Sequence, residues 1–223
     1  MQSALKGALS FRLQARQLTC ERDDRVLFHG LDLEVGPGQI VRIEGPNGSG
    51  KTTLLKILSG QLSDYQGELY WDEAPMHAAR DAFLANLLYL GHAPGIKGAL
   101  TALENLSWHQ AMAGEAGEHQ ARMAALAEIG LAGFEDVPCA QLSAGQQRRV
   151  ALARLSLIPR LLWVLDEPFT AIDKDGVAAL ERRLLSHAAR GGSVILTTHH
   201  DLAPLGDIRR VRLGEGGRVN AAR

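Results

Sequence analysis

The chain alternates short apolar runs with longer stretches in which apolar residues recur every three or four positions. Residues 31–35 alternate apolar and polar side chains and stop at a Pro-Gly pair, which predicts a half-buried strand and a turn. Residues 161–165 are apolar without a break, a pattern typical of a strand buried on both faces of a parallel sheet. Residues 39–44 and 193–198 predict two further strands. We therefore expect an α/β fold in which helices cover both faces of a parallel sheet.

Helical spacing occupies the remaining segments. A helix is expected from Lys51 to just before Gly60, where glycine commonly follows the last helical turn. Residues 93–160 are rich in alanine and contain no strand-like run, which predicts a mostly helical insertion. A further helix carries one apolar stripe, which ends before two glycines and consists of Val177, Leu180, Leu184, Leu185 and Ala188.

Length and charge restrict the possible functions. The chain has 223 residues, a net charge of −1 and two cysteines. The balanced charge gives no argument for nucleic acid or an acidic membrane surface. Cys20 and Cys139 form no metal-binding or redox pair, so a reducing cytosol is expected. No apolar run is long enough to span a bilayer, and the first residues lack the pattern of a signal peptide. We expect a protein that does not cross a membrane by itself.

A phosphate-binding loop lies between the strand at 39–44 and the helix from Lys51. Its glycines allow successive backbone N–H groups to surround phosphates, and the helix directs its positive end toward them. The Lys51 ammonium can reach the β and γ oxygens, and the Thr52 hydroxyl can bind Mg²⁺. The predicted ATP-binding residues are Gly45, Pro46, Asn47, Gly48, Ser49, Gly50, Lys51, Thr52 and Thr53.

Acidic and histidine side chains follow the other buried strands. Asp166 ends the run at 161–165, where a parallel sheet commonly binds its ligand, and is the second predicted Mg²⁺ residue. Glu167 is the candidate that orients or deprotonates the attacking water. His199 follows the strand at 193–198 and can donate a hydrogen bond to the γ-phosphate, whereas His200 should point elsewhere. The predicted catalytic residues are Glu167, His199 and Lys51.

Residues 142–149 (LSAGQQRR), together with the phosphate loop, the strand ending in Asp166 and the TTHHD segment at 197–201, closely resemble the ABC-type ATPases. The resemblance extends over essentially the whole chain. It implies a P-loop NTPase with a RecA-like parallel-sheet core, an N-terminal antiparallel β part and a helical subdomain. Residues 1–223 would form one domain, with the core at about 1–92 and 160–223 and the helical subdomain at about 93–159.

The same resemblance implies a head-to-tail homodimer with two Mg-ATP at its interface. The signature segment of one subunit would meet the γ-phosphate bound to the other; its residues are Leu142, Ser143, Ala144, Gly145 and Gln146. Ser143 is a good N-cap, and a helix start binds anions. Asp173 looks like the D-loop acid that contacts the partner subunit.

The chain departs from the family pattern at three positions. Ala144 stands in the signature segment at a position where the family most often has glycine. The added methyl group should be tolerated unless that residue needs a positive φ. Arg22 stands where an aromatic residue usually stacks on adenine; its guanidinium could stack instead, or Phe28 could substitute. His92 occupies the position where the family has the glutamine of the Q-loop, and imidazole is a poor ligand for Mg²⁺. We expect His92 to act through water or mainly to transmit motion to the helical subdomain.

Residues 20–35, 87–106, 142–155 and 163–173 resemble more narrowly the ATP-binding subunits of the haem exporters of bacterial cytochrome c maturation. This implies a peripheral protein at the cytoplasmic face of the inner membrane, with an integral membrane partner of the CcmB type and with CcmC and CcmD. Whether ATP moves haem or releases a haem-loaded chaperone stays open. The scattered histidines suggest no haem site and nothing suggests a nucleic-acid partner.

Two alternatives remain. The chain could serve an ABC exporter for another substrate, since the membrane partner selects what is carried. It could instead be a soluble ABC ATPase acting on nucleic acid or ribosomes. The stretch between Lys51 and Asp166 has no room for the long coiled coil of such proteins, and the balanced charge provides no basic surface for a nucleic-acid backbone.

Overall fold

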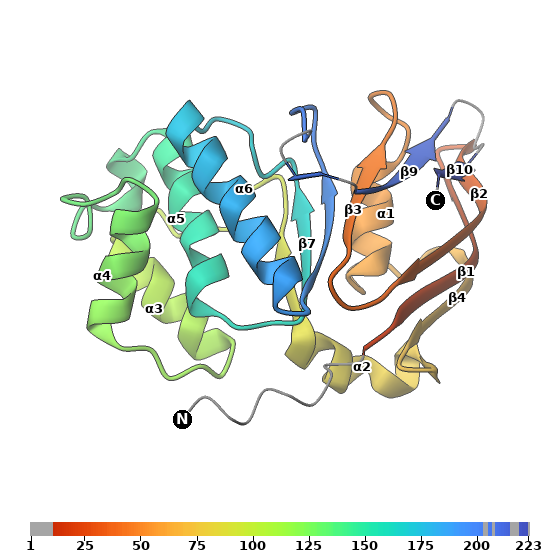
Figure 1. The fold of residues 1–223 in the computed structure, drawn as a ribbon, viewed down its shortest axis with the longest axis horizontal. Coiled ribbons are helices and arrows are strands. Elements are labelled where there is room, and N and C mark those ends of the chain that lie inside the picture. The colour runs from red at the N-terminus through yellow and green to blue at the C-terminus, as the bar shows by residue number, and fades with distance from the viewer. Residues whose placement is uncertain (1–10, 203–204, 207, 215–218, 223) are drawn as a thin grey trace.

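Two β-sheets lie side by side, with a group of helices beyond the larger sheet (Figure 1). The structure is a computed structural model that describes residues 11–202, 205–206, 208–214 and 219–222. The first residues, on which part of the signal-peptide expectation rests, lie mostly outside this range. Among the described residues, no helix combines the length and the apolar character needed to cross a bilayer.

The strands and helices follow one another closely along the chain. The strands are β1 (Leu13–Arg22), β2 (Arg25–Val35), β3 (Ile40–Glu44), β4 (Gln66–Trp71), β5 (Ala74–Pro75), β6 (Leu87–Leu90), β7 (Leu162–Asp166), β8 (Ser193–Thr197), β9 (Arg209–Leu213) and β10 (Val219–Ala222). The helices are α1 (Lys51–Leu58), α2 (Met76–Asn86), α3 (Ala102–Met112), α4 (His119–Glu128), the 3₁₀ helix η1 (Cys139–Gln141), α5 (Ala144–Leu157) and α6 (Lys174–Ala189).

The smaller sheet is antiparallel, with strand order β2-β1-β4-β5. The predicted strand at 31–35 forms the end of β2, and its residues alternate between buried and exposed as expected. The buried side chains of β1 and β2 pack onto α1 in one apolar cluster. The expected N-terminal antiparallel part is therefore confirmed.

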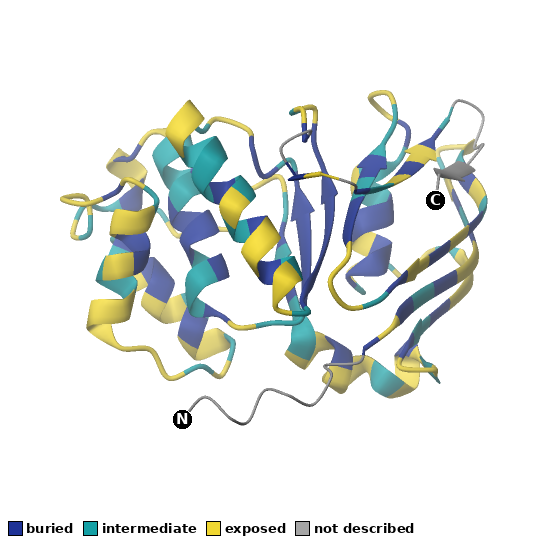
Figure 2. Ribbon diagram, in the orientation of Figure 1, coloured by how far each residue is buried: buried dark blue, intermediate teal, exposed yellow. Residues whose placement is uncertain are grey.

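The larger sheet has the order β10-β9-β3-β8-β7-β6, and its inner pairings are parallel. All five residues of β7 are buried, as the unbroken apolar run predicts. Leu162 and Val164 belong to the cluster that contains α1, whereas Trp163 and Leu165 belong to the cluster that contains α5 and α6. Alternate side chains thus leave opposite faces of the strand, and helices cover both faces (Figure 2).

The chain between β6 and β7 folds into α3, α4, η1 and α5, as the absence of strand-like runs predicts. Thr101 and Ser143 cap α3 and α5 with capping boxes, in which the cap side chain and the third helical residue satisfy each other's backbone N–H groups. Leu126 and Leu106 are buried in a third apolar cluster between these helices.

One prediction for α6 is wrong. Leu185, assigned to the apolar stripe, is exposed, because it follows the buried Leu184 by one residue and is rotated by about 100° around the helix. The next buried position on that face is His187, whose ring stacks on Trp163 with 3.6 Å between ring centroids.

Candidate nucleotide site

The loop between β3 and α1 contains three glycines with positive φ. These are Gly45 at 154°, Gly48 at 76° and Gly50 at 92°. A Cβ on Gly45 would lie 2.5 Å from the Leu213 carbonyl oxygen and 2.6 Å from Ser49 Oγ, so only glycine fits there. The backbone therefore turns at residues that no side chain obstructs, and α1 begins at Lys51 with its N-terminal N–H groups directed out of the helix.

Two side chains of the loop carry polar groups suited to an anion. The Lys51 ammonium donates to the carbonyl oxygens of Gly45, at 2.8 Å, and Pro46, at 3.0 Å, so it lies across the mouth of the loop. Ser49 is buried, and its hydroxyl has no hydrogen-bond partner among the described residues. A buried hydroxyl without a partner is costly unless a ligand or water satisfies it.

Asp166 is held by two threonine hydroxyls. Thr52 Oγ1 donates to Asp166 Oδ2 at 2.9 Å, which joins the start of α1 to the end of β7. Thr197 Oγ1 donates to Asp166 Oδ1 at 2.6 Å from the neighbouring strand β8. The carboxylate is almost fully buried and accepts a hydrogen bond at each oxygen, so its orientation is fixed.

Glu167 and His199 lie opposite each other at the ends of β7 and β8. Glu167 has a φ of 49°, a left-handed conformation that is uncommon for residues other than glycine. Its Oε1 lies 3.6 Å from His199 Nε2, and its Oε2 accepts a hydrogen bond from the His199 backbone N–H at 3.3 Å. His200 points elsewhere, as predicted, and its Nε2 lies 3.0 Å from Glu181 Oε1.

These elements enclose one hollow of about 510 Å³. The loop lies on one side, and the ends of β7 and β8 lie on the other. The lining residues are Leu27, Asn47, Gly48, Gly50, Lys51, Thr52, Thr53, His92, Asp166, Glu167, Thr170 and His199. A volume of this size is typical of a small-molecule site.

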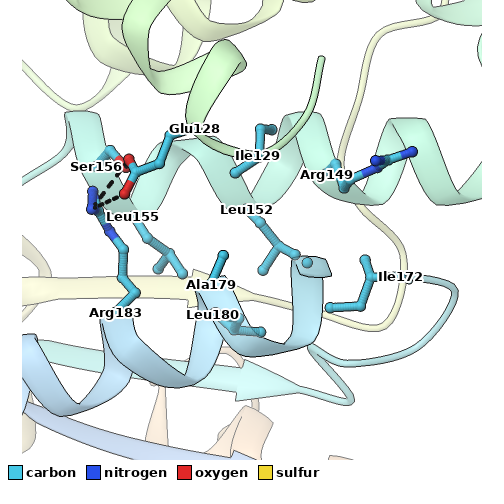
Figure 3. Close-up of a pocket in the computed structure, with 11 residues that line it drawn as sticks. Glu128, Ile129, Arg149, Leu152, Leu155, Ser156, Ile172, Ala179, Leu180 and Arg183 are labelled. Carbon is cyan, nitrogen blue, oxygen red and sulfur yellow. Dashed lines mark hydrogen bonds and ion pairs between the residues drawn. The ribbon is translucent and has the colours of Figure 1, made fainter. Parts of the chain in front are cut away.

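A second hollow lies among α4, α5 and α6, and its walls are mainly apolar (Figure 3). Its volume is about 30 Å³, which is about the share of one water molecule in the liquid. Glu128 closes one end through hydrogen bonds from Arg183 and Ser156. This space is too small for a nucleotide. The hollow beside the phosphate loop is the candidate site because Lys51, Thr52 and Asp166 line it.

Two of the residues that depart from the family pattern, His92 and Arg22, lie in different places relative to the hollow. His92 is exposed and lines the hollow. Arg22 does not line it; the guanidinium pairs with Asp64 at 3.4 Å on the surface. Phe28, the alternative to Arg22, is fully buried in the core, so its ring has no face free for a base. Leu27 provides the apolar wall instead.

The signature segment lies outside the hollow, since none of residues 142–146 lines it. Ser143 caps α5, as predicted, by accepting a hydrogen bond from the Gln146 N–H at 3.2 Å. Ala144 is the first residue of α5 and needs no positive φ, so its methyl group is tolerated. Gly145 has no such freedom, because a Cβ there would collide with the Ala171 carbonyl oxygen.

Asp173 has a local role in this structure. It is the N-cap of α6, and its carboxylate accepts a hydrogen bond from the Gly176 N–H at 2.8 Å. The other carboxylate oxygen lies 3.4 Å from Arg149 Nη1. The side chain remains more than half exposed, so it can still reach a neighbouring molecule.

Several residues outside the predicted set also shape the site. Leu27 and Thr170 line the hollow, and Thr197 holds Asp166. Thr197 could have been found from its position at the end of a buried strand beside His199. Arg148, which donates to carbonyl groups at the ends of β6 and β7, has no comparable signal in the sequence.

Comparisons with known proteins agree with this geometry. The ABC transporter family model matches residues 28–170. Over 206 residues the chain is 55% identical to the cytochrome c biogenesis ATP-binding export protein CcmA 1 of Salmonella typhimurium, covering 92% of this chain and 98% of the relative. The CcmA protein of Hahella chejuensis is 56% identical over 202 residues, which cover 91% of this chain and 95% of the relative.

Solved structures show the same fold. An ATP-binding subunit of an ABC transporter superposes with a TM-score of 0.80 at 25% identity, over 94% of this chain and 89% of that one. The ATP-binding cassette MJ0796 was solved as a dimer in a post-hydrolysis state with ADP and phosphate. It gives a TM-score of 0.80 at 24% identity, over 95% of this chain and 99% of that one.

The phosphate loop, the buried aspartate and the parallel sheet define a nucleotide-binding ATPase of the P-loop class. Within that class, the chain belongs to the ABC transporter family. The family resemblance and the fold class expected from the sequence are confirmed.

Proposed function

We propose that the chain is the ATPase subunit of a membrane complex that handles haem for cytochrome c maturation. The observation that carries this proposal is the identity of 55% to a CcmA protein over 92% of the chain. The partner we infer is an integral membrane protein of the CcmB type, associated with CcmC and CcmD. The chain would then lie at the cytoplasmic face of the inner membrane, as one domain with a helical subdomain at about 93–159.

We further propose that two copies bind two ATP molecules head to tail. The position of the signature segment supports this arrangement, because residues 142–146 begin a helix and yet do not line the chain's own hollow. A capped helix start is a good anion site, and a second copy would bring its helix start to the γ-phosphate. Asp173 would contact the partner from the adjacent loop.

The residues in the hollow suit Mg-ATP. Asp166 offers a buried carboxylate, and Thr52 offers a hydroxyl oxygen beside it; both line the hollow and are oxygen ligands of the kind that Mg²⁺ prefers. When bound, the ion neutralises charge on the phosphate oxygens. Thr52 and Asp166 would hold it, directly or through water.

Each catalytic side chain has a distinct task. Lys51 and the loop N–H groups bind the phosphates and stabilise charge that develops on them. Glu167, fixed at the end of β7, orients the attacking water and accepts its proton. His199 lies beside Glu167 and donates to the γ-phosphate, while His92 contacts the site from the end of β6 through water.

Genetic complementation tests the cellular role. In a bacterium whose own CcmA gene is deleted, the intact chain should restore covalent haem in c-type cytochromes, measured by haem stain after denaturing electrophoresis. The Lys51→Ala chain should not restore it. Lys56→Ala is the matched control, because Lys56 is an exposed lysine on the same helix. If the intact chain is produced at normal levels without restoring haem attachment, the haem role is wrong and export of another substrate becomes the better account.

A further inference from the structure

Arg148 is a buried charged residue in the first half of α5. Only 5% of its surface is exposed. Burial lowers the pKa of the guanidinium from its ordinary value, while the nearby carboxylates of Asp166 and Glu167 act in the opposite direction. Burying a charge is costly unless hydrogen bonds compensate for it, so the contacts of this side chain explain why it lies there.

The guanidinium joins the ends of two neighbouring strands. Nη1 donates to the carbonyl oxygen of Gly91, at 2.7 Å, and more weakly to that of His92, at 3.4 Å. Nη2 donates to the carbonyl oxygens of Asp166, at 2.7 Å, and Glu167, at 3.0 Å. The pairing of β6 with β7 ends where Leu90 faces Leu165. Arg148 therefore bridges the two strands just beyond their last paired residues.

The same contact fixes the backbone of Glu167. Its N–H donates to Thr197 Oγ1 at 3.0 Å, and its carbonyl oxygen accepts from Arg148. A left-handed φ of 49° at a glutamate persists only where the surroundings hold it. Thr197 and Arg148 hold the residue from both sides, and Arg148 does so from the helix that begins at the signature segment.

We propose that Arg148 is a positioning residue for ATP hydrolysis: it fixes the backbone of Glu167 and ties α5 to the ends of β6 and β7. The proposal rests on the proposed role of Glu167. Because the signature segment begins α5, this link would also connect each subunit's own catalytic carboxylate with the helix start that it offers to its partner's nucleotide.

A substitution at Arg148 should leave the fold in place. Further along α5, Leu152 and Leu155 share a buried cluster with Leu180 of α6 (Figure 3). Val150 and Ala153 lie in the cluster formed with α3 and α4. Both faces of the helix are therefore packed independently of the guanidinium.

Arg148→Lys is the sharpest test, because it keeps the positive charge but removes the planar guanidinium with its two donor nitrogens. An ammonium presents its donors from one atom and cannot span two pairs of carbonyl groups as a guanidinium does. We expect kcat for ATP hydrolysis by the full chain to fall about 10–100-fold, the loss that misplacement of a reacting group by about 1 Å can produce. The affinity for ATP, measured by calorimetry, should stay within about threefold, because the phosphate loop does not contact Arg148.

Arg122→Lys is the matched control. Arg122 also donates to a backbone carbonyl, that of Gly117 at 2.9 Å, but its contacts lie within the helical part. The kcat of the Arg122→Lys chain should stay within about twofold of the kcat of the unaltered chain. Far-UV circular dichroism fixes a common assay temperature at which every variant is folded. Arg148→Ala, assayed with and without methylguanidinium, provides a second measurement, and the added guanidinium should recover part of the rate.

Three results would overturn the proposal: an unchanged kcat in Arg148→Lys, equal losses of kcat and ATP affinity, or an Arg122→Lys loss as large as that of Arg148→Lys. A Glu167→Gln chain assayed in parallel shows whether the positioning role of Arg148 or the catalytic role of Glu167 is the part that is wrong. If Glu167→Gln hydrolyses ATP normally, the role of Glu167 is wrong; if it is inactive while Arg148→Lys is normal, only the positioning role is wrong.

Discussion

Thr197 Oγ1 donates a 2.6 Å hydrogen bond to Asp166 Oδ1, across the parallel pair of β8 and β7. The same hydroxyl oxygen accepts a hydrogen bond from the Glu167 N–H at 3.0 Å. One buried hydroxyl thus orients the predicted Mg²⁺ carboxylate and the backbone of the predicted base. Thr52 completes the arrangement from the start of α1.

Replacing Thr197 with valine should slow ATP hydrolysis strongly. Valine has nearly the same shape but leaves Asp166 Oδ1 without this partner, and a buried polar group that loses its partner costs about 1–3 kcal/mol. The Glu167 N–H keeps only its longer hydrogen bond to the Thr197 carbonyl oxygen, at 3.2 Å. We expect kcat to fall about tenfold or more. Thr197→Ser keeps the hydroxyl and should retain most of the rate. Equal activity of the valine and serine variants in a phosphate-release assay would show that the hydroxyl has no such role.

Lys51→Ala should abolish measurable ATP hydrolysis. The ammonium lies across the phosphate loop, where it can reach the predicted phosphates. Lys56→Ala, on the last turn of the same helix, should behave like the unaltered chain. Steady-state phosphate release measures both. Normal turnover by Lys51→Ala would remove the argument for the phosphate site.

Arg22→Ala should weaken ATP binding by about 0.5–1 kcal/mol if the guanidinium stacks on the base. The surface pair of Arg22 with Asp64 does not prevent this, because exposed ion pairs cost about 0–1 kcal/mol to break. Titration calorimetry with ATP gives the dissociation constant, and Asp64→Ala is the control that frees Arg22. Unchanged affinity in Arg22→Ala would leave Leu27 as the wall that faces the base.

The parts of the fold that depend on a repeating pattern could be predicted from the sequence. The unbroken run before Asp166 indicated a strand buried on both faces, and the structure places Trp163 and Val164 in different clusters. The phosphate loop could be recognised because its chemistry requires glycines at fixed spacing. Leu185 shows where prediction from hydrophobicity fails. Successive residues of a helix point about 100° apart, so Leu184 faces the core and Leu185 faces solvent, and hydrophobicity alone does not reveal which of the two is buried.

Contacts between distant segments could not be predicted in this way. Arg148 meets Gly91 and Asp166 only because α5 packs beside the ends of β6 and β7. The left-handed backbone of Glu167 likewise results from tertiary contacts, since nothing in its own side chain favours that conformation.

Stability should fall in mild acid because of His187. Burial, together with the charges of Arg190 and Arg183, lowers the pKa of this ring to about 4. The ordinary value of 6.5 applies to the unfolded chain, which therefore takes up a proton between pH 6.5 and about 4 while the folded chain does not. The contribution of neutral His187 is complete above pH 6.5 and decreases as the pH falls toward about 4.

Urea unfolding at about pH 7 and pH 5 should show a loss of about 2 kcal/mol from this residue. The loss should be smaller by that amount in His187→Gln, and unchanged in His77→Gln, which alters an exposed histidine. The half-buried His109, whose pKa is also lowered to about 4 by burial and by Arg154, should contribute in the same direction. Identical pH dependence in His187→Gln and the unaltered chain would contradict this assignment.

We infer that ATP joins two copies of the chain and that hydrolysis, with Glu167 as the base, releases them. The direct measurement is the mass of Glu167→Gln by light scattering after size exclusion, with and without Mg-ATP. We predict a monomer that becomes a stable dimer only with Mg-ATP, and a hydrolysis rate lower by about 10²–10⁴-fold. A chain that hydrolyses ATP at the normal rate, or stays monomeric with saturating Mg-ATP, would contradict the account.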